Sequence, residues 1–310
     1  MSGKFIISLD YEKAWGFNDL LSEPTDFSRF EGVDDIVNKI LDIFSRYDFK
    51  ATWAVVTGML DHSDDIFEHR TLESLTLDND FTKLIAEKKI SSKAYRTCIN
   101  NIAEAGHEIA SHTHTHIYCD DRNFSICEII NDIRKSVEFI EVIAGKSCES
   151  IVFPRNQVSE EILKTLQDNK VGIKFYRGNN TYISDAVNSK LTLPTKLIRF
   201  FDSYLPISRT SYSMIEENEF KVVNIPASRF LRITKSSLMN KVHLRRIKSE
   251  MTKAAITSQN YHLWWHPHNF LVNENSAFFI LDELLKHYHH LAKEYNFKCS
   301  TMKDILVNEK

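Results

Sequence analysis

Four histidines and a carboxylate lie within eleven residues of the chain. The segment reads Gly106-His107-Glu108-Ile109-Ala110-Ser111-His112-Thr113-His114-Thr115-His116. In a β-strand, His112, His114 and His116 would share one face, whereas a helical turn would pair only His112 with His116. Either conformation brings two imidazoles together. Because two imidazoles and one carboxylate bind a divalent transition metal and leave positions open for water and substrate, the segment predicts a hydrolytic metal site.

The H-x-x-x-H spacing alone also occurs in histidine-rich loops that bind nothing, so other residues must decide between the two interpretations. Asp10 and Glu12 follow an apolar run at 4–9, Arg155 follows a second run at 150–153, and His266 follows a third at 261–265. The carboxyl ends of parallel strands meet at one edge of an α/β fold. We therefore expect these side chains to meet the histidines in space.

Strands and helices alternate along the chain, which favours a parallel, barrel-like α/β architecture over a sandwich or a bundle. Ser159 is a suitable N-cap for the helix that follows it. Predicted strands are 4–9, 49–56, 107–111, 150–153, 171–176, 221–226, 261–265 and 298–301, and predicted helices are 34–47, 93–105, 124–144, 160–169, 236–257 and 275–295.

Composition indicates one globular unit of ordinary character. The 310 residues are 43% hydrophobic and 26% charged, and only 8 glycines and 6 prolines argue against long flexible linkers. A net charge of -3 gives no reason to expect nucleic acid or an anionic membrane as partner. We see no secretory signal and no run long enough to span a membrane. Five scattered cysteines without a C-x-x-C pair also make a disulfide framework improbable, so we expect a cytoplasmic protein.

The ordered motifs resemble those of the polysaccharide deacetylase family, the NodB-homology carbohydrate esterases. The most specific match is His112, Thr113 and His116 to the metal motif H-[ST]-x-x-H. The resemblance implies a distorted parallel (β/α) barrel of the TIM-like kind, here a single domain over 1–310 with insertions around 60–92 and 177–219. The other matching segments are Ser8-Leu9-Asp10-Tyr11-Glu12 for T-F-D-D-G, Lys50-Ala51-Thr52-Trp53-Ala54-Val55 for the second strand, Val152-Phe153-Pro154-Arg155-Asn156 for R-x-P-Y, and Trp264-Trp265-His266 for L-x-H.

The resemblance also assigns roles to residues of the predicted site. It implies a divalent metal, expected to be Zn²⁺, bound by Glu12, His112 and His116. Asp10 is the expected general base by its position in the motif, although Tyr11 replaces the second aspartate of the family and the two acids could exchange roles. Arg155 follows the proline instead of preceding it and is expected to pair with Asp10 and keep it ionised.

The remaining assignments concern the leaving group and the substrate. His266 would protonate the departing amine, since an amine does not leave as an anion at neutral pH. Trp15, Trp264 and His268 are the expected substrate contacts, His268 being a rival proton donor, and Trp264 and Trp265 cannot both face inward from one strand. His107 and His114 are expected to lie outside the ligand set.

The resulting hypothesis is hydrolysis of an N-acetyl group on an amino sugar of a polysaccharide or its precursor, in surface polysaccharide biosynthesis. Two alternatives stay open. One is a metal-independent amidohydrolase that cleaves a non-peptide C–N bond with the same fold, with which the altered first motif is compatible. The other is a sugar-binding relative without catalysis.

Overall fold

Nine strands in the described part of the chain pair into one sheet, and every pair in it is parallel. The structure is a computed structural model that describes residues 2–17, 30–60, 92–119, 124–178, 201–205 and 219–306. The expected insertions, 60–92 and 177–219, lie largely outside these residues. The strands are β1 (Lys4–Tyr11), β2 (Thr52–Val55), β3 (Glu108–Ser111), β4 (Ser150–Ile151), β5 (Phe175–Tyr176), β6 (Val223–Asn224), β7 (Arg229–Phe230), β8 (Tyr261–Trp265) and β9 (Lys298–Ser300).

The strand order is β6-β5-β4-β3-β2-β1-β8-β7, with β9 paired to the start of β1. The segment 223–231, which contains β6 and β7, bridges the two ends of this order. Its backbone amides donate to β5 and its extension, from Ile225 to Tyr176 and from Ala227 to Gly178, and then to β8, from Ser228 to His262 and from Leu231 to Trp264. The sheet is thus curled into the predicted distorted parallel (β/α) barrel, closed by a segment that changes partners after Ala227.

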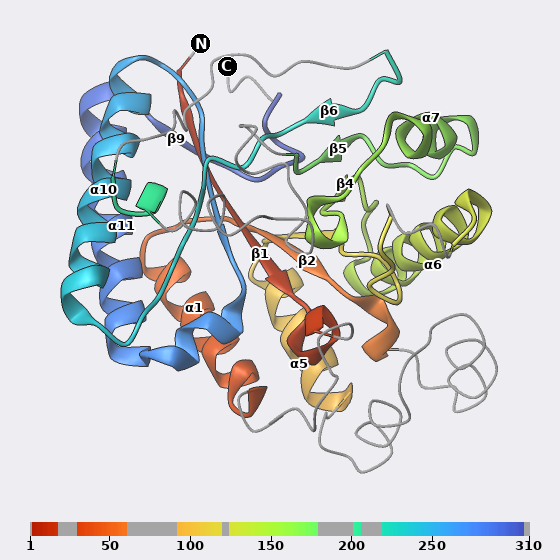
Figure 1. Ribbon diagram of the computed structural model, residues 1–310, viewed down its shortest axis with the longest axis horizontal. Helices are drawn as coiled ribbons and strands as arrows, with labels where there is room; N and C mark the ends of the chain where they lie inside the picture. The colour runs from red at the N-terminus through yellow and green to blue at the C-terminus, as the bar shows by residue number, and fades with distance from the viewer. Residues whose placement is uncertain are drawn as a thin grey trace.

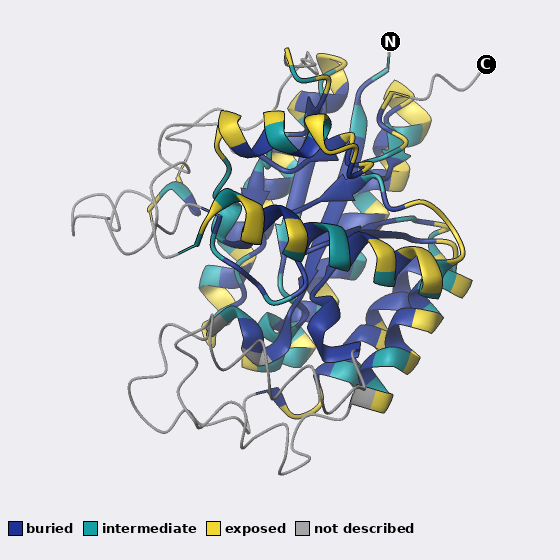
Figure 2. Cartoon of the chain, turned by 90° about the vertical axis from the view of Figure 1, so that its right-hand side faces the viewer, coloured by how far each residue is buried: buried dark blue, intermediate teal, exposed yellow. Residues whose placement is uncertain are grey.

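The described helices cover the outside of this barrel. Figure 1 shows α10 (Ser237–Ile256) and α11 (Glu274–Tyr295) on one side of β1, with α6 (Ile126–Ala144) and α7 (Glu160–Asp168) on the other. Helices α1 (Val33–Arg46) and α5 (Ser92–Glu104) complete the layer. In Figure 2 the strands are buried and the helices expose only their outer faces, as expected for amphipathic helices packed on a core. Ser159 caps α7 by accepting from the Ile162 amide, as predicted.

Strand alternation separates two sets of buried side chains. On β1, Phe5, Ile7, Leu9 and Tyr11 belong to the large core between sheet and helices, whereas Ile6 belongs to a small cluster with residues of six other segments. That cluster fills the barrel interior, and its members are Ile6, Ala54, Ala110, Val152, Phe175, Val223, Ile225, Met302 and Ile305. Because side chains alternate along a strand, positions two residues further along also face the interior. The site is built from these positions at the carboxyl ends of the strands.

Several histidines are buried in neutral form, and His243 on α10 shows why. Its Nδ1 donates to the Ser203 carbonyl at 2.7 Å and its Nε2 accepts from the Arg232 amide at 3.1 Å. Burial lowers the pKa of His243 to about 4, and the pKa values of His107 and His262 fall in the same way.

We expect the free energy of unfolding to fall as the pH drops from about 6.5 to about 4. In that range the histidines of the unfolded chain bind protons and those of the folded chain do not. The stability that the neutral histidines contribute is therefore fully present above about pH 6.5 and is lost as the pH falls toward about 4. His243 alone accounts for about 3 kcal/mol of that loss. Urea unfolding of the wild type and of His243→Gln at several pH values measures the effect. The variant should be less stable at neutral pH but should lose less stability on acidification, and an equal loss in both proteins would contradict the assignment.

Among the helices of the described residues, none is both long enough and apolar enough to cross a membrane.

Candidate functional site

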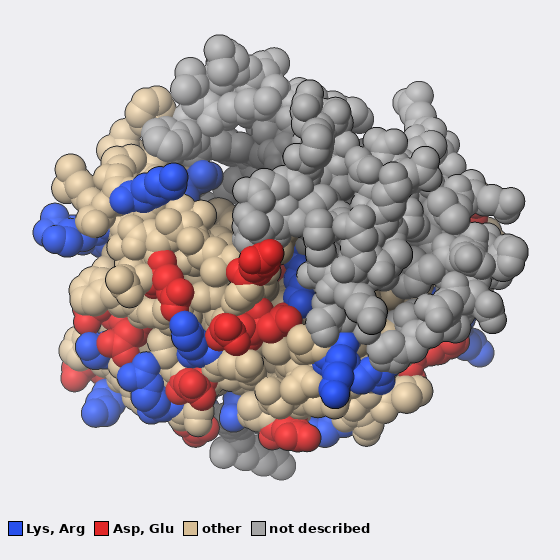
Figure 3. All heavy atoms as spheres, turned by 90° about the horizontal axis from the view of Figure 1, so that it is seen from below, with Lys and Arg blue, Asp and Glu red and all other residues tan. Residues whose placement is uncertain are grey.

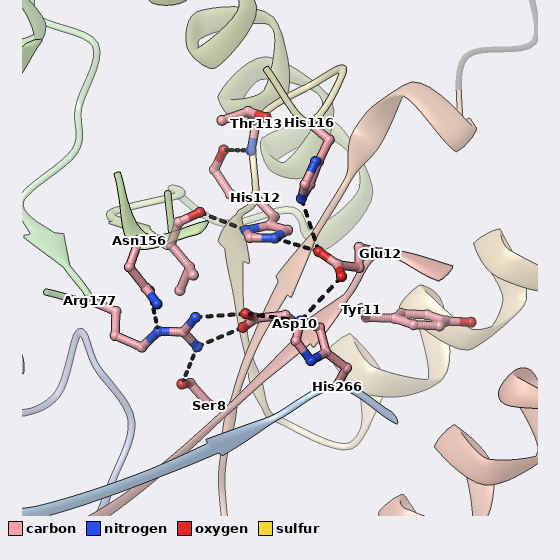
Figure 4. A network of polar contacts seen from close by, with 12 residues as sticks. Ser8, Asp10, Tyr11, Glu12, His112, Thr113, His116, Asn156, Arg177 and His266 are labelled. Atoms are coloured by element: carbon pink, nitrogen blue, oxygen red, sulfur yellow. Dashed lines mark hydrogen bonds and ion pairs between the residues drawn. The ribbon is translucent and has the colours of Figure 1, made fainter. Parts of the chain in front are cut away.

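Glu12, His112 and His116 converge at the carboxyl end of the barrel, as Figure 4 shows. The Glu12 Oε2 atom lies 2.9 Å from His112 Nε2 and 3.0 Å from His116 Nε2. One ligand atom from each residue lies within 4.8 Å of the other two, and all three residues are buried. The two imidazoles therefore meet a single carboxylate, the donor set of a His₂-carboxylate metal site.

Alternation along β1 explains why the carboxylate comes from Glu12. Asp10 faces the barrel interior, so Tyr11 points the other way, into the helix layer, where its hydroxyl donates to Asp34. The Tyr11 ring packs on Tyr95 at a centroid distance of 4.6 Å. The next side chain that can face the site belongs to Glu12, one residue later than in the family motif. The longer glutamate side chain reaches the imidazoles from that position.

The histidine segment is neither a strand nor a helical turn. Strand β3 ends at Ser111, and Thr113 and His116 have left-handed backbones with φ of 66° and 57°. This conformation brings His112 and His116 together. It sends His114 away, to the Thr57 hydroxyl at 2.9 Å and the Phe139 ring.

Helix α6 holds this loop in place through Asp132. Its carboxylate accepts from the His114 amide at 2.7 Å, the Thr115 amide at 3.1 Å and the Thr115 hydroxyl at 2.6 Å. On the other side, the Gly58 amide donates to the His114 carbonyl at 2.7 Å. A left-handed residue without glycine costs on the order of 1–2 kcal/mol, so such contacts are what keep the ligand loop in this shape. Sequence patterns gave no sign of Asp132, because an acid on an amphipathic helix is usually solvated.

The ring orientation of His112 suits metal binding. Its Nδ1 lies 2.7 Å from the Val152 carbonyl oxygen, which can only accept, so Nδ1 carries a proton. In the neutral ring, Nε2 then presents its lone pair toward Glu12 and His116. A histidine ligand commonly donates its second N–H to a backbone carbonyl in this way. The residues present therefore fit a divalent metal.

Glycine at position 16 leaves room for the Glu12 carboxylate. A Cβ atom there would lie 1.9 Å from Glu12 Oε1, far closer than non-bonded atoms approach. We expect Gly16→Ala to displace the carboxylate and to weaken zinc binding about 10- to 100-fold, as for loss of an outer-shell partner. Isothermal titration with Zn²⁺ measures this affinity. Gly145→Ala is the control: its added Cβ would meet no non-neighbouring atom within 4 Å, so the left-handed φ of 61° should cost stability without changing zinc affinity. Equal zinc affinities of Gly16→Ala and the wild type would contradict this account.

Asp10 pairs with Arg177 instead of Arg155, which corrects the expected pairing. Arg177 NH1 and NH2 each donate to one Asp10 oxygen at 2.6 Å, and both side chains are buried. Burial alone would raise the pKa of Asp10, but Arg177, with smaller contributions from His112 and His266, outweighs burial and lowers that pKa. The Arg155 guanidinium lies over the Tyr118 ring at 4.4 Å.

Backbone geometry explains why Arg177, and not Arg155, pairs with Asp10. Arg155 lies in the short helix η4 (Pro154–Asn156) with a left-handed φ of 55°. Arg177 lies two residues after Phe175, which faces the barrel interior, so alternation turns Arg177 inward as well. The position directly after the predicted strand at 171–176 was the signal that could have found it.

His266 completes the site from β8. Its Nε2 lies 3.2 Å from Glu12 Oε1 and 3.9 Å from Asp10 Oδ2, and its side chain is 22% exposed. Burial opposes a charge on this ring, but the carboxylates of Glu12 and Asp10 outweigh it and raise the pKa of His266. The surroundings of this imidazole therefore favour its protonated form.

Of the three expected substrate contacts, two lie beside His266 and one does not. The His268 ring stacks on His266 with centroids 5.0 Å apart, and the Trp264 and His266 ring centroids lie 5.6 Å apart. Trp264 also lies under the Arg177 guanidinium, whereas Trp265 is buried in the core on the opposite face of β8. Trp15 is only 1% exposed and belongs to the hydrophobic core, so the expectation that it faces a sugar is wrong.

The surface at the lower end of the barrel in Figure 1 carries mixed charge. Figure 3 shows Lys and Arg interspersed with Asp and Glu over the coloured part of this face. The described part of this face therefore presents no broad patch of a single sign to an approaching substrate.

Comparisons with known proteins agree with this fold. A comparison with curated protein sequences found no match. Among solved structures, the chain is similar to one described as a polysaccharide deacetylase from Mycobacterium smegmatis, with a TM-score of 0.60 and 13% identity over 98% of this chain and 90% of the other. It is also similar to the allantoinase PuuE, at 0.58 and 12% over 97% and 88%. A third, described as a polysaccharide deacetylase from Pseudomonas aeruginosa PAO1, gives 0.57 and 10% over 97% and 89%.

At these identities the structural similarities show the fold alone. A family model adds a match from the sequence: residues 30–176 match the family described as polysaccharide deacetylase. This match includes His112 and His116 but neither Glu12 nor His266, which the fold adds to the same site. The expected resemblance to the polysaccharide deacetylase family is thereby confirmed over residues 30–176.

Proposed function

We propose that the protein is a metal-dependent hydrolase that removes the N-acetyl group from an amino sugar of a polysaccharide or its precursor. The observation that carries the proposal is the convergence of Glu12, His112 and His116 beside Asp10 and His266. The match of residues 30–176 to the polysaccharide deacetylase family supports a C–N hydrolase with an acetylated carbohydrate substrate. A place in surface polysaccharide biosynthesis is the setting that we infer for it.

Glu12 Oε2, His112 Nε2 and His116 Nε2 are the atoms that would hold the metal, and Zn²⁺ matches two imidazoles and a carboxylate best. When bound there, such a metal polarises a carbonyl group and lowers the pKa of the attacking water. With only three protein ligands, a metal held there would keep a position for water or substrate, as a catalytic site requires.

Asp10 serves as the general base in this proposal. Arg177 fixes both of its oxygens and holds the carboxylate in the ionised form that can accept a proton from water. The same pairing argues against an exchange of roles between the two acids, because Asp10 is turned to Arg177 while Glu12 is turned to the imidazoles. Glu12 thus serves as the metal ligand.

His266 serves as the general acid. Its Nε2 lies 3.2 Å from Glu12 Oε1 and 3.9 Å from Asp10 Oδ2, and these two carboxylates favour the protonated imidazole. Proton transfer from Nε2 to the departing nitrogen lets the sugar leave as a neutral amine. Trp264 and His268 lie beside it and are the candidates to contact the sugar ring.

The expected result of metal removal tests this proposal. We expect the protein to release acetate from tetra-N-acetylchitotetraose, to lose that activity after chelation, and to regain it with one equivalent of Zn²⁺. Acetate release is followed by a coupled enzymatic assay. Full activity of the metal-free protein would instead support the metal-independent amidohydrolase alternative. Binding of acetylated sugars without any acetate release would support the sugar-binding alternative.

A further inference from the structure

The inference concerns how Arg177 is held, and it rests on the proposed role of Asp10 as base. Besides its two bonds to Asp10, Arg177 donates from Nε to Asn156 Oδ1 at 3.1 Å and from NH1 to Ser8 Oγ at 3.0 Å. Its guanidinium lies 4.2 Å above the Trp264 ring centroid. A buried guanidinium needs this many partners because each unsatisfied N–H inside a protein costs free energy.

Ser8 lies on β1 two residues before Asp10 and is fully buried in the barrel interior. Its hydroxyl has one proton to donate and accepts from Arg177 NH1. The second partner of Ser8 Oγ is His262 Nε2 on β8, at 2.8 Å. Ser8 therefore joins the arginine to a second buried side chain.

The tautomer of His262 gives this chain of bonds a direction. His262 Nδ1 lies 3.3 Å from the Ile225 carbonyl oxygen, which only accepts, so Nδ1 carries the proton. Burial and the charge of Arg177 keep the ring neutral and lower the pKa of His262 to about 3. Nε2 then has a lone pair and accepts from the Ser8 hydroxyl, which leaves the Ser8 oxygen free to accept from Arg177.

We propose that Ser8 and His262 are positioning residues: they form a buried relay, Ile225 carbonyl to His262 to Ser8 to Arg177, that fixes the guanidinium on Asp10. Neither residue contacts the three metal ligands through any bond that the structure shows. They act on the reaction only through Arg177. In Figure 4, Ser8 lies on the side of Arg177 away from His112 and Glu12.

The test compares variants that break the relay with variants that keep it. Ser8→Ala removes the hydroxyl, His262→Leu removes the acceptor, and His262→Gln keeps an acceptor near the position of Nε2. For acetate release from tetra-N-acetylchitotetraose, we expect kcat to fall about 10- to 100-fold in the first two, with little change in KM or zinc affinity. The double variant should be no worse than the poorer single one, and His262→Gln should recover part of the loss.

His243→Leu is the matched control, since it also removes a buried neutral histidine but one bonded to Ser203 and Arg232. It should lose stability without losing kcat. If Ser8→Ala keeps wild-type kcat, or if His243→Leu lowers kcat as much as His262→Leu, the relay is wrong and these residues only support the fold.

Two readouts do not depend on activity, so the relay can be judged even if the wild type releases no acetate and the proposed function fails. In ¹⁵N-histidine-labelled protein, His262 should be the neutral Nδ1–H tautomer at about pH 5, where an ordinary histidine is charged. In a crystal structure of Ser8→Ala, the Arg177 guanidinium should turn away from the plane of the Asp10 carboxylate. An Nε2–H tautomer, or an unmoved guanidinium in that variant, would overturn the proposal.

Discussion

Replacing Glu12 with glutamine is expected to abolish acetate release and to lower zinc affinity at least about 100-fold. Loss of a residue that only supports a metal ligand lowers affinity up to about 100-fold, so loss of a ligand should cost at least as much. Glutamine keeps the size of the side chain but removes the charge that His112, His116 and His266 all face. The glutamine amide also places an N–H group opposite the imidazoles, whereas the Glu12 carboxylate offers oxygens that accept a hydrogen bond or bind a metal. Zinc titration and the acetate assay measure the two effects.

Glu108→Gln is the matched control for this variant. Glu108 is equally buried, but it accepts from the hydroxyls of Thr52 and Ser150 in the barrel interior, and no imidazole among the described residues bonds to it. We expect it to change stability and to leave zinc affinity within about threefold of wild type. Glu12→Gln with unchanged zinc affinity would mean that the carboxylate is not a ligand.

Removing Arg177 is expected to have the second largest effect. Arg177→Ala leaves the Asp10 carboxylate buried without its partner, which costs about 3–5 kcal/mol of stability for a buried pair. We expect kcat for acetate release to fall at least about 100-fold, because the base is no longer held in place. Arg177→Lys keeps the charge but cannot make two parallel bonds, so it should recover stability better than activity.

Arg155→Ala tests the arginine that the motif assigned to Asp10. Its guanidinium lies over Tyr118 and makes no bond to Asp10 that the structure shows, so we expect kcat to stay within about fivefold of wild type. Kinetics and urea unfolding of the two alanine variants, measured side by side, decide the matter. A larger loss of activity in Arg155→Ala than in Arg177→Ala would restore the assignment made from the motif.

Strong local patterns made much of the fold predictable. The apolar run of β1, the stripe of α6 and the Ser159 cap each depend on neighbouring residues, and all three were found close to their observed bounds. Strand β7 was missed because two residues are too short for a periodic pattern. Its place in the barrel depends instead on the change of partners after Ala227.

The residues of the candidate site also divide into those that local sequence patterns indicate and those that depend on distant packing. Glu12 and His112 could be predicted because each directly follows a recognisable strand, and His116 because of its H-x-x-x-H spacing from His112. Arg177 and Asp132 could not, since their partners lie 167 and about 18 residues away and depend on how the barrel closes and how α6 packs. Trp15 was misjudged because an aromatic residue after a strand looks the same in sequence whether it faces a ligand or the core.

The most direct test of the metal site is an anomalous difference map from crystals grown with one equivalent of Zn²⁺ and measured at the zinc absorption edge. We predict one strong peak about 2.0–2.2 Å from Glu12 Oε2, His112 Nε2 and His116 Nε2. The peak should be absent in Glu12→Gln crystals. No peak at these three atoms in wild-type crystals, with zinc bound elsewhere or not at all, would contradict the account.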